Sequence, residues 1–270
     1  MYIAKMSWEE IERIQFDKSV LFLPIAPIEE HGPHLPAGVD CIIAEEACRR
    51  SSMKLQKTSS LKPYIFPLIP LGVAVESADF PGTISLPETL FAALIHQTLL
   101  NVTRWGFTKC VIVSPHASPA HLACIHAGIQ LAQKECAIQI VEPLVQWVFG
   151  FSISNTSKRK EAPSSIPDIH AGEYETSMML HLHPELVKSE KLPYLPERAI
   201  ENMREPGTWK EKGAIEGYLG TPSKASEEKG KQYIQSLEKW ADAALALEKH
   251  TNNELPPFIS AKVAAILERM

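Results

Sequence analysis

Residues 19–40 read "SVLFLPIAPIEEHGPHLPAGVD", and the fold can be predicted outward from this stretch. Its first part, residues 20–26, is an uncharged run rich in Val, Ile and Leu, which is typical of a strand buried inside a parallel sheet. Its second part carries two glutamates, two histidines and an aspartate within twelve positions. Gly and Pro separate these residues and exclude a single regular element, so a loop rich in ionisable groups is expected to follow the strand.

The rest of the chain alternates strand-like and helix-like segments. Strands are predicted at residues 20–26, 63–72, 109–115 and 137–143, and helices at 41–55, 86–106, 120–136, 172–186 and 226–249. This alternation predicts an α/β fold, a three-layer sandwich whose mainly parallel central sheet is flanked by helices. A chain of 270 residues is expected to form a single domain over residues 1–270.

Three segments carry finer expectations. Prolines in residues 63–72 favour an edge strand or an irregular strand end. Residues 151–168 are polar and rich in serine and proline, so we expect a long loop that could act as a lid. The helix at 86–106 is expected to end at Gly106 and to turn a stripe of apolar side chains toward the core, namely Leu90, Leu94, Leu99 and Val102.

Composition narrows the classes of function. The net charge is −5 with a pI near 6.1, and no basic stripe is present, so nucleic-acid binding is not expected. Apolar runs are interrupted by proline and are too short for a membrane span, and the N-terminus lacks the apolar core of a signal peptide. Five scattered cysteines, none spaced as CxxC, suit a reducing compartment. A cytoplasmic protein with no membrane partner is therefore expected.

The first ionisable cluster contains a possible metal-ligand set. Glu29 and His31 are two positions apart and point to the same side of an extended backbone, whereas Glu30 points away. Asp40 returns after a turn rich in Gly and Pro. Glu, His and Asp together suit a divalent ion such as Zn, Mn or Fe. The alternative is a solvated loop in which Asp40 simply caps the helix that begins at Cys41.

Two further clusters follow later elements. "SPHASPAH" (114–121) comes directly after a predicted strand and contains His116, and "DIHAGEYET" (168–176) opens a predicted helix. Because active sites of open α/β sheets lie outside the carboxyl ends of the strands, the clusters are expected to form one site. The alternatives are a loop histidine held by hydrogen bonds at position 116, and glutamates that favour the helix dipole at positions 173 and 175.

The remaining histidines have weaker arguments. His121 and His126 are expected on a helix and are interpreted as structural. Of the two, His121 is the better candidate for a role in the site. The others have no spacing that indicates a site: His34, His96, His181, His183 and His250. Trp147 is interpreted as a core residue or as a platform for a flat ring. The chain has no GxGxxG, GxxxxGK[ST] or GxSxG, so nucleotide-binding and serine-hydrolase functions have no support.

Four ordered motifs give the chain a resemblance to the creatininase (creatinine amidohydrolase) family. The segment at 29–40 is similar to the family's E-x-H-G-x-H-L-P-x-x-x-D signature. The others are "DFPGTISLP" (79–87), "HAGEYETS" (170–177) and "GYLGTPSKASEEKGKQ" (217–232), which resemble its F-P-G-T, H-A-G-x-x-E-T-S and G-x-x-G-x-P-x-x-A-x-x-x-K-G segments. The resemblance covers most of the chain.

The resemblance implies an α/β sandwich, usually a homohexamer, with one or two divalent ions per chain. The matching metal ligands are Glu29, His31, Asp40 and His116, with Asp40 bridging. His170 matches the catalytic histidine, and Glu175 matches a glutamate beside the metals that either assists catalysis or binds metal. Family members hydrolyse C–N bonds of small amides, including the creatinine ring and formamides. The implied function is therefore metal-dependent hydrolysis of a small amide, cyclic or not, or of a formamide.

One motif departs from the family pattern. The family has N-G-H-G-G-N or N-G-H-x-E-N where this chain has "SPHASP" (114–119), so Ser118 stands where creatininases place a metal-binding glutamate. We expect a weakened second metal position and an altered substrate fit, which argues against creatinine. The alternative function is a catalytically degenerate member that acts as a binding or assembly protein.

Overall fold

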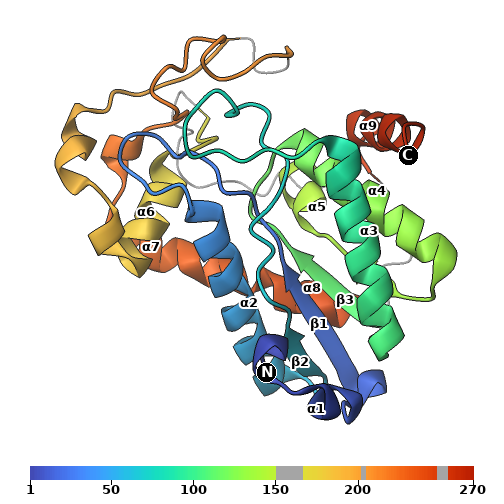
Figure 1. The fold of residues 1–270 in the computed structure, drawn as a ribbon. Helices are drawn as coiled ribbons and strands as arrows, with labels where there is room; N and C mark the ends of the chain where they lie inside the picture. The colour runs from blue at the N-terminus through green and yellow to red at the C-terminus, as the bar shows by residue number, and fades with distance from the viewer. Residues whose placement is uncertain (150–166, 202–204, 248–254) are drawn as a thin grey trace, which may run out of the picture.

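The computed structural model describes residues 1–149, 167–201, 205–247 and 255–270 (Figure 1). Its centre is a four-stranded sheet with the order β2-β1-β3-β4, in which every neighbouring pair is parallel. The strands are β1 (Ser19–Pro24), β2 (Lys62–Ile65), β3 (Lys109–Val113) and β4 (Gln139–Val141). The predicted parallel sheet is therefore confirmed.

Helices cover both faces of the sheet. The longer ones are α2 (Val39–Thr58), α3 (Glu88–Trp105), α4 (Pro119–Glu135), α6 (Glu173–Leu182) and α9 (Pro257–Leu267). The shorter ones are α1 (Trp8–Glu12), α5 (Leu144–Phe149), α7 (Glu227–Ile234) and α8 (Lys239–Ala246). The 3-10 turns are η1 (Ile3–Lys5), η2 (Phe16–Lys18), η3 (Pro184–Leu186), η4 (Ser189–Tyr194), η5 (Pro222–Lys224) and η6 (Gln235–Glu238).

Strand β1 is buried along its whole length because it supplies both layers of the core. Leu21 and Leu23 pack on one face with apolar residues of α3, α4 and α9. Val20 and Phe22 pack on the other face with residues of α2, α6 and α8. Successive side chains of a strand point to opposite faces, so the uncharged run of β1 serves two cores. The predicted three-layer sandwich is confirmed (Figure 1).

The strand order creates a switch point between β1 and β3. The chain leaves β1 through α2 to reach β2 on one side, and leaves β3 through α4 to reach β4 on the other. Right-handed crossovers in opposite directions place α2 and α4 on opposite faces, so the carboxyl ends of β1 and β3 border a crevice. The loops that follow these two strands carry the first two ionisable clusters.

Several predicted elements are shorter than expected. The strand predicted at 63–72 forms a regular ladder only over Lys62–Ile65 and continues as isolated bridges at Ile69 and Gly72, because the prolines at 67 and 70 interrupt the ladder. The helix predicted at 226–249 is α7, η6 and α8 in succession, and residues 248–254 lie outside the described chain. The loop predicted at 151–168 falls almost entirely on residues 150–166, which the structure does not describe.

Helix α3 confirms most of its predicted pattern. It ends at Gly106, whose φ of 121° is the conformation that favours glycine. Leu99 and Val102 are fully buried, and Leu94 packs against the core. The prediction that Leu90 faces the core is wrong, because this residue is 55% exposed. The helices within the described residues include none with the length and hydrophobicity of a transmembrane span.

Candidate metal centre

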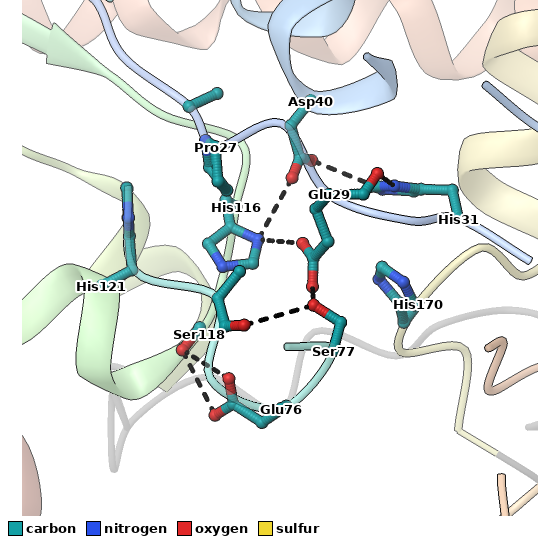
Figure 2. Close-up of polar contacts among 12 residues, drawn as sticks. Pro27, Glu29, His31, Asp40, Glu76, Ser77, His116, Ser118, His121 and His170 are labelled. Atoms are coloured by element: carbon teal, nitrogen blue, oxygen red, sulfur yellow. Dashed lines mark hydrogen bonds and ion pairs between the residues drawn. The ribbon is translucent and has the colours of Figure 1, made fainter. Parts of the chain in front are cut away.

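Ionisable residues from all three sequence clusters meet at the carboxyl end of the sheet (Figure 2). Glu29 and His31 follow β1, His116 follows β3, and Asp40 lies in the first turn of α2. His170 precedes α6 and Glu175 lies in its first turn. The switch point of the sheet therefore brings together residues separated by up to about half of the chain.

The turn that returns Asp40 to the cluster is held by the main chain. The Glu29 amide donates a hydrogen bond to the Ala37 carbonyl at 2.9 Å, and Gly32 supplies a φ of 68° within the loop. Helix α2 begins at Val39 with Gly38 as its N-cap, so Asp40 is not the cap. Its buried carboxylate faces the cluster from the helix N-terminus, where the helix dipole stabilises negative charge.

Three overlapping groups of donor atoms could hold a cation, with the atoms of each group within 4.8 Å of one another. They are Glu29 with Asp40 and His116, His31 with Asp40 and Glu175, and Glu29 with His31 and His170. Asp40 belongs to two groups because its oxygens face opposite ways. One oxygen lies 3.1 Å from His116 Nδ1, and the other lies 3.8 Å from His31 Nε2.

Each histidine of the cluster has one ring nitrogen bonded to a main-chain carbonyl. His31 Nδ1 contacts the Glu29 carbonyl at 3.0 Å, His116 Nε2 contacts the Val73 carbonyl at 3.1 Å, and His170 Nε2 contacts the Glu30 carbonyl at 2.8 Å. A carbonyl oxygen can only accept, so that nitrogen carries the proton. The other nitrogen of each neutral ring is then available to a metal, an arrangement typical of metal-binding histidines.

Several buried polar atoms at the centre have no hydrogen-bond partner. They are Glu29 Oε2, Asp40 Oδ2 and His31 Nε2. Glu29 Oε2 lies 2.9 Å from His116 Nδ1, so lone pairs converge there unless a proton or a cation lies between them. Burying such atoms without a partner is costly, and a divalent cation would satisfy them together. The mixed nitrogen and oxygen donors fit Zn, Mn or Fe.

Without a metal, the surrounding carboxylates favour the protonated forms of His116 and His170. Burial disfavours the charged forms, but the Glu29 and Asp40 carboxylates raise the pKa of His116 well above its ordinary value. Burial also opposes the charge of Glu29, yet the His116 and His170 rings lower the pKa of Glu29. Metal binding at such a site would release protons, so its affinity would depend on pH.

His170 and Glu175 are positioned by a strained turn before α6. Ala171 has a φ of 49°, and its amide donates to Glu175 Oε2 at 2.6 Å. Asp168 caps the helix by accepting from the amides of residues 173 and 174. Burial would lower the pKa of His170, but the negative charges of Glu29, Glu30 and Glu175 raise it to about 10. Burial raises the pKa of Glu175 above its ordinary value.

Other predicted residues lie differently. Glu173 bonds to the Tyr233 hydroxyl and pairs with Lys229, so it points away from the cluster. Glu30 is absent from the three donor groups, but its carboxylate lies 3.5 Å from His170 Nε2, a contact the sequence did not predict. Trp147 is 41% exposed and packs edge-to-face on Trp240, so it is not a core residue.

The remaining histidines that the structure describes lie outside the three donor groups. His96, His126 and His183 pair with Glu135, Glu142 and Glu185. His34 is buried beside the site, where its Nε2 contacts the Thr176 hydroxyl at 2.8 Å. Residue 250 lies outside the described chain. Cys41 is adjacent to Asp40, but burial raises the pKa of its thiol to about 12, which disfavours a thiolate ligand.

A segment that borders the cluster was not predicted from the sequence. Residues 72–77 contribute the Val73 carbonyl to His116 and the Ser77 hydroxyl to Glu29. Ser118 donates its hydroxyl to the Glu76 carboxylate at 3.1 and 3.3 Å, so this carboxylate lies beside the position that lacks a glutamate. The only signal in the sequence is proximity to the "DFPGTISLP" motif that begins at residue 79.

Comparison with known proteins agrees with this architecture. The sequence model of the Creatininase family, described as creatinine amidohydrolase, matches residues 4–245. A creatinine amidohydrolase of Pseudomonas putida is 26% identical over 204 residues, or 71% of this chain and 75% of that protein. A 3-dehydro-scyllo-inosose hydrolase of Thermotoga maritima is 23% identical over 279 residues, or 95% of this chain and 87% of that protein.

Solved structures share the fold. One named "Creatininase Mn" superposes with a TM-score of 0.72 at 22% identity and covers 93% of this chain and 99% of its own. A creatininase of "Zn-Zn type" gives a TM-score of 0.71 at 22% identity and covers 93% of this chain and 98% of its own.

A further relative was found by sequence alone. A mycofactocin precursor peptide peptidase of Mycolicibacterium smegmatis is 25% identical over 175 residues, or 64% of this chain and 62% of that protein.

Proposed function

Because the chain belongs to the creatininase family, we propose that it is a metal-dependent hydrolase that cleaves the C–N bond of a small amide, cyclic or not, or of a formamide. One observation carries this proposal. Two groups of donor atoms share Asp40, and three buried atoms among them have no hydrogen-bond partner, namely Glu29 Oε2, Asp40 Oδ2 and His31 Nε2. The named relatives are hydrolases, and two of the names specify an amide or a peptide as the substrate.

The proposed ligands divide between two positions. Glu29, Asp40 and His116 would hold one ion, and His31, Asp40 and Glu175 would hold a second, with Asp40 between them. A divalent ion at such a position supplies a Lewis acid that polarises a carbonyl and lowers the pKa of water. Zn, Mn and Fe all suit these donors, and solved relatives are named for Mn and Zn.

His170 is the proposed proton donor to the leaving nitrogen. Burial opposes its charge, but in the metal-free site the surrounding carboxylates raise its pKa to about 10. The Glu30 carbonyl fixes the ring by accepting from Nε2. Ala171, which follows His170, donates its amide hydrogen to the Glu175 carboxylate. This hydrogen bond holds the Glu175 carboxylate next to His31. Glu175 is therefore proposed both as a ligand and as a group that favours the charged ring.

The 114–119 loop supports a hydrolase over the non-catalytic alternative. The non-catalytic alternative would be supported if the two prolines of this loop kept His116 away from the cluster. His116 instead lies 2.9 Å from Glu29 and 3.1 Å from Asp40. Ser118 bonds to Glu76 and brings no carboxylate of its own, so we propose a substrate other than creatinine.

The assembly is proposed from family membership. The family's usual state is a homohexamer, and we propose the same for this chain, with no nucleic-acid or membrane partner. Light scattering of the purified protein would report the mass directly. A mass of one 30.0 kDa chain would contradict this part of the proposal.

The substitution His170→Ala tests the proposed function. Hydrolysis of a panel of cyclic amides and formamides, measured with Zn and with Mn, is expected for the wild type and lost in the variant, while metal content is unchanged. His183→Ala is the matched control, because His183 lies at the end of α6 and pairs only with Glu185 among the contacts seen here. Loss of metal together with activity would make His170 a ligand. A metal-loaded wild type that hydrolyses nothing in the panel would favour the non-catalytic alternative.

A further inference from the structure

Residues 72–77, named here the orienting segment, lie against two of the proposed ligands (Figure 2). The segment joins β2 to α3 and belongs to neither. Its ends are fixed by main-chain bonds, since the Gly72 carbonyl accepts from Leu86 at 2.9 Å and the Glu76 carbonyl accepts from Trp209 at 2.6 Å. A loop held at both ends can place its polar atoms against the cluster with little freedom.

Ser77 determines which oxygen of Glu29 faces the centre of the cluster. Ser77 is fully buried, and its hydroxyl donates to Glu29 Oε1 in a short hydrogen bond. That bond satisfies Oε1 and leaves Oε2 directed at His116 Nδ1, 2.9 Å away, without a hydrogen-bond partner. Without the hydroxyl, the carboxylate could rotate, and either oxygen could leave the position that faces Asp40 and His116.

Val73 fixes the ring of His116 in the same way. Its carbonyl accepts from His116 Nε2 at 3.1 Å, which directs Nδ1 toward both carboxylates. The amide of Val73 donates to Nδ1 of His121 at 3.2 Å. One residue of the segment therefore connects a proposed ligand to a second buried histidine, and the position of its carbonyl depends on both bonds.

His121 anchors the segment from helix α4. Because its Nδ1 accepts from Val73, its proton lies on Nε2, which contacts the Ser114 hydroxyl at 3.1 Å. Its ring stacks on Phe91 of α3 with the ring centroids 4.8 Å apart. A Cβ at Gly72 would lie 2.7 Å from this ring, so only glycine permits this close approach.

We propose that the orienting segment presets Glu29 and His116 for metal binding, with Ser77 as the positioning residue for Glu29 and His121, through Val73, for His116. This inference rests on the proposed function, because it presumes that the cluster binds a divalent ion. It concerns the group formed by Glu29, Asp40 and His116. The group formed by His31, Asp40 and Glu175 has no side-chain contact with the segment among the contacts described. Outer hydrogen-bond partners of metal ligands are typically worth about 10- to 100-fold in metal affinity.

The test compares the substitution Ser77→Ala with Ser51→Ala. Ser51 is also fully buried and loses one hydrogen bond, to the Leu237 carbonyl at 2.9 Å, but it lies on α2 away from the donor groups. Zn²⁺ affinity of the full chain, measured by competition with a chelator of known affinity, is expected to fall about 10- to 100-fold in Ser77→Ala only. Unfolding of the metal-free proteins by urea checks that the two variants are similarly stable.

A second variant and a spectrum separate positioning from packing. His121→Phe keeps an aromatic ring beside Phe91 and removes the acceptor of the Val73 amide, so Zn²⁺ affinity is expected to fall again. The Co²⁺ absorption spectrum of the saturated protein is expected to change in Ser77→Ala and to match the wild type in Ser51→Ala, because only the first alters a ligand's orientation.

The outcomes are distinct. Zn²⁺ affinity in Ser77→Ala equal to that of the wild type, or lowered equally in Ser51→Ala, overturns the positioning role while leaving the proposed metal site intact. A wild type that binds no Zn²⁺ overturns the proposed function and this inference with it. A selective loss of affinity with an altered Co²⁺ spectrum supports the role of Ser77.

Discussion

Replacement of Asp40 by asparagine should remove most of the stabilisation that metal gives to the folded chain. The Asp40 carboxylate faces His116 with one oxygen, at 3.1 Å, and His31 with the other, at 3.8 Å. Asparagine has nearly the same shape but only one oxygen, and that oxygen is neutral. At least one donor group would therefore lose its shared ligand, and the other would keep only a weak one.

The magnitude follows from linkage between binding and folding. A metal present at 100 times its dissociation constant stabilises a folded protein by about 2.7 kcal/mol, which for a chain of this size raises Tm by roughly 5–10 °C. Loss of a direct ligand should weaken affinity at least about 100-fold, since even an outer partner is worth 10- to 100-fold. The same metal concentration would then stabilise the variant by about 0.4 kcal/mol, or roughly 1 °C.

Thermal unfolding of metal-free protein, titrated with Zn²⁺ or Mn²⁺, measures this difference. The control is Asp242→Asn, which makes the same change at an exposed residue of α8 that pairs with Lys54, outside the donor groups. The control should show the wild-type shift in Tm. If Asp40→Asn also kept the full shift, Asp40 would not be a shared ligand and the assignment of both donor groups would be wrong.

Two further predictions concern stability. Burial, reinforced by the charges of His31 and His170, lowers the pKa of His34 to about 4 from its ordinary 6.5, so its contribution to stability is present above pH 6.5 and is lost as the pH falls toward 4. In urea titrations at several pH values, His34→Gln should therefore lose less unfolding free energy than the wild type between pH 6.5 and pH 4, by up to about 3 kcal/mol. An unchanged dependence of the unfolding free energy on pH would contradict the lowered pKa of His34. Ile112→Ala, at a fully buried position of β3, should cost about 2–5 kcal/mol, whereas Leu90→Ala, 55% exposed, should cost less than about 0.5 kcal/mol by the same assay. Equal costs would place Leu90 in the core after all.

The layers of the fold could be predicted because they depend on local patterns. The apolar run of β1 and the helical spacing of α3 are visible in short windows of sequence, and both elements formed where expected. The errors come from tertiary context. Leu90 has the helical spacing of a core residue, yet it faces outward, because the window does not reveal how far the neighbouring elements extend.

The candidate site was predictable where its residues come in motifs and not where they come singly. Glu29, His31 and Asp40 lie within twelve consecutive residues, so their convergence could be expected from that stretch alone. Ser77 could not be found in this way, because a lone serine between β2 and α3 carries no spacing signal. Its contact with Glu29 spans 48 positions and exists only once the sheet has formed.

The most direct test of the central claim is the metal content of the purified wild-type chain, measured by elemental analysis after mild dialysis. One or two equivalents of a divalent metal per chain are expected, and two if both groups that share Asp40 are occupied. A chain that contains none, and that regains none when Zn or Mn is added, would contradict a metal centre at Asp40, because the unpartnered atoms at the centre of the cluster would then have another explanation.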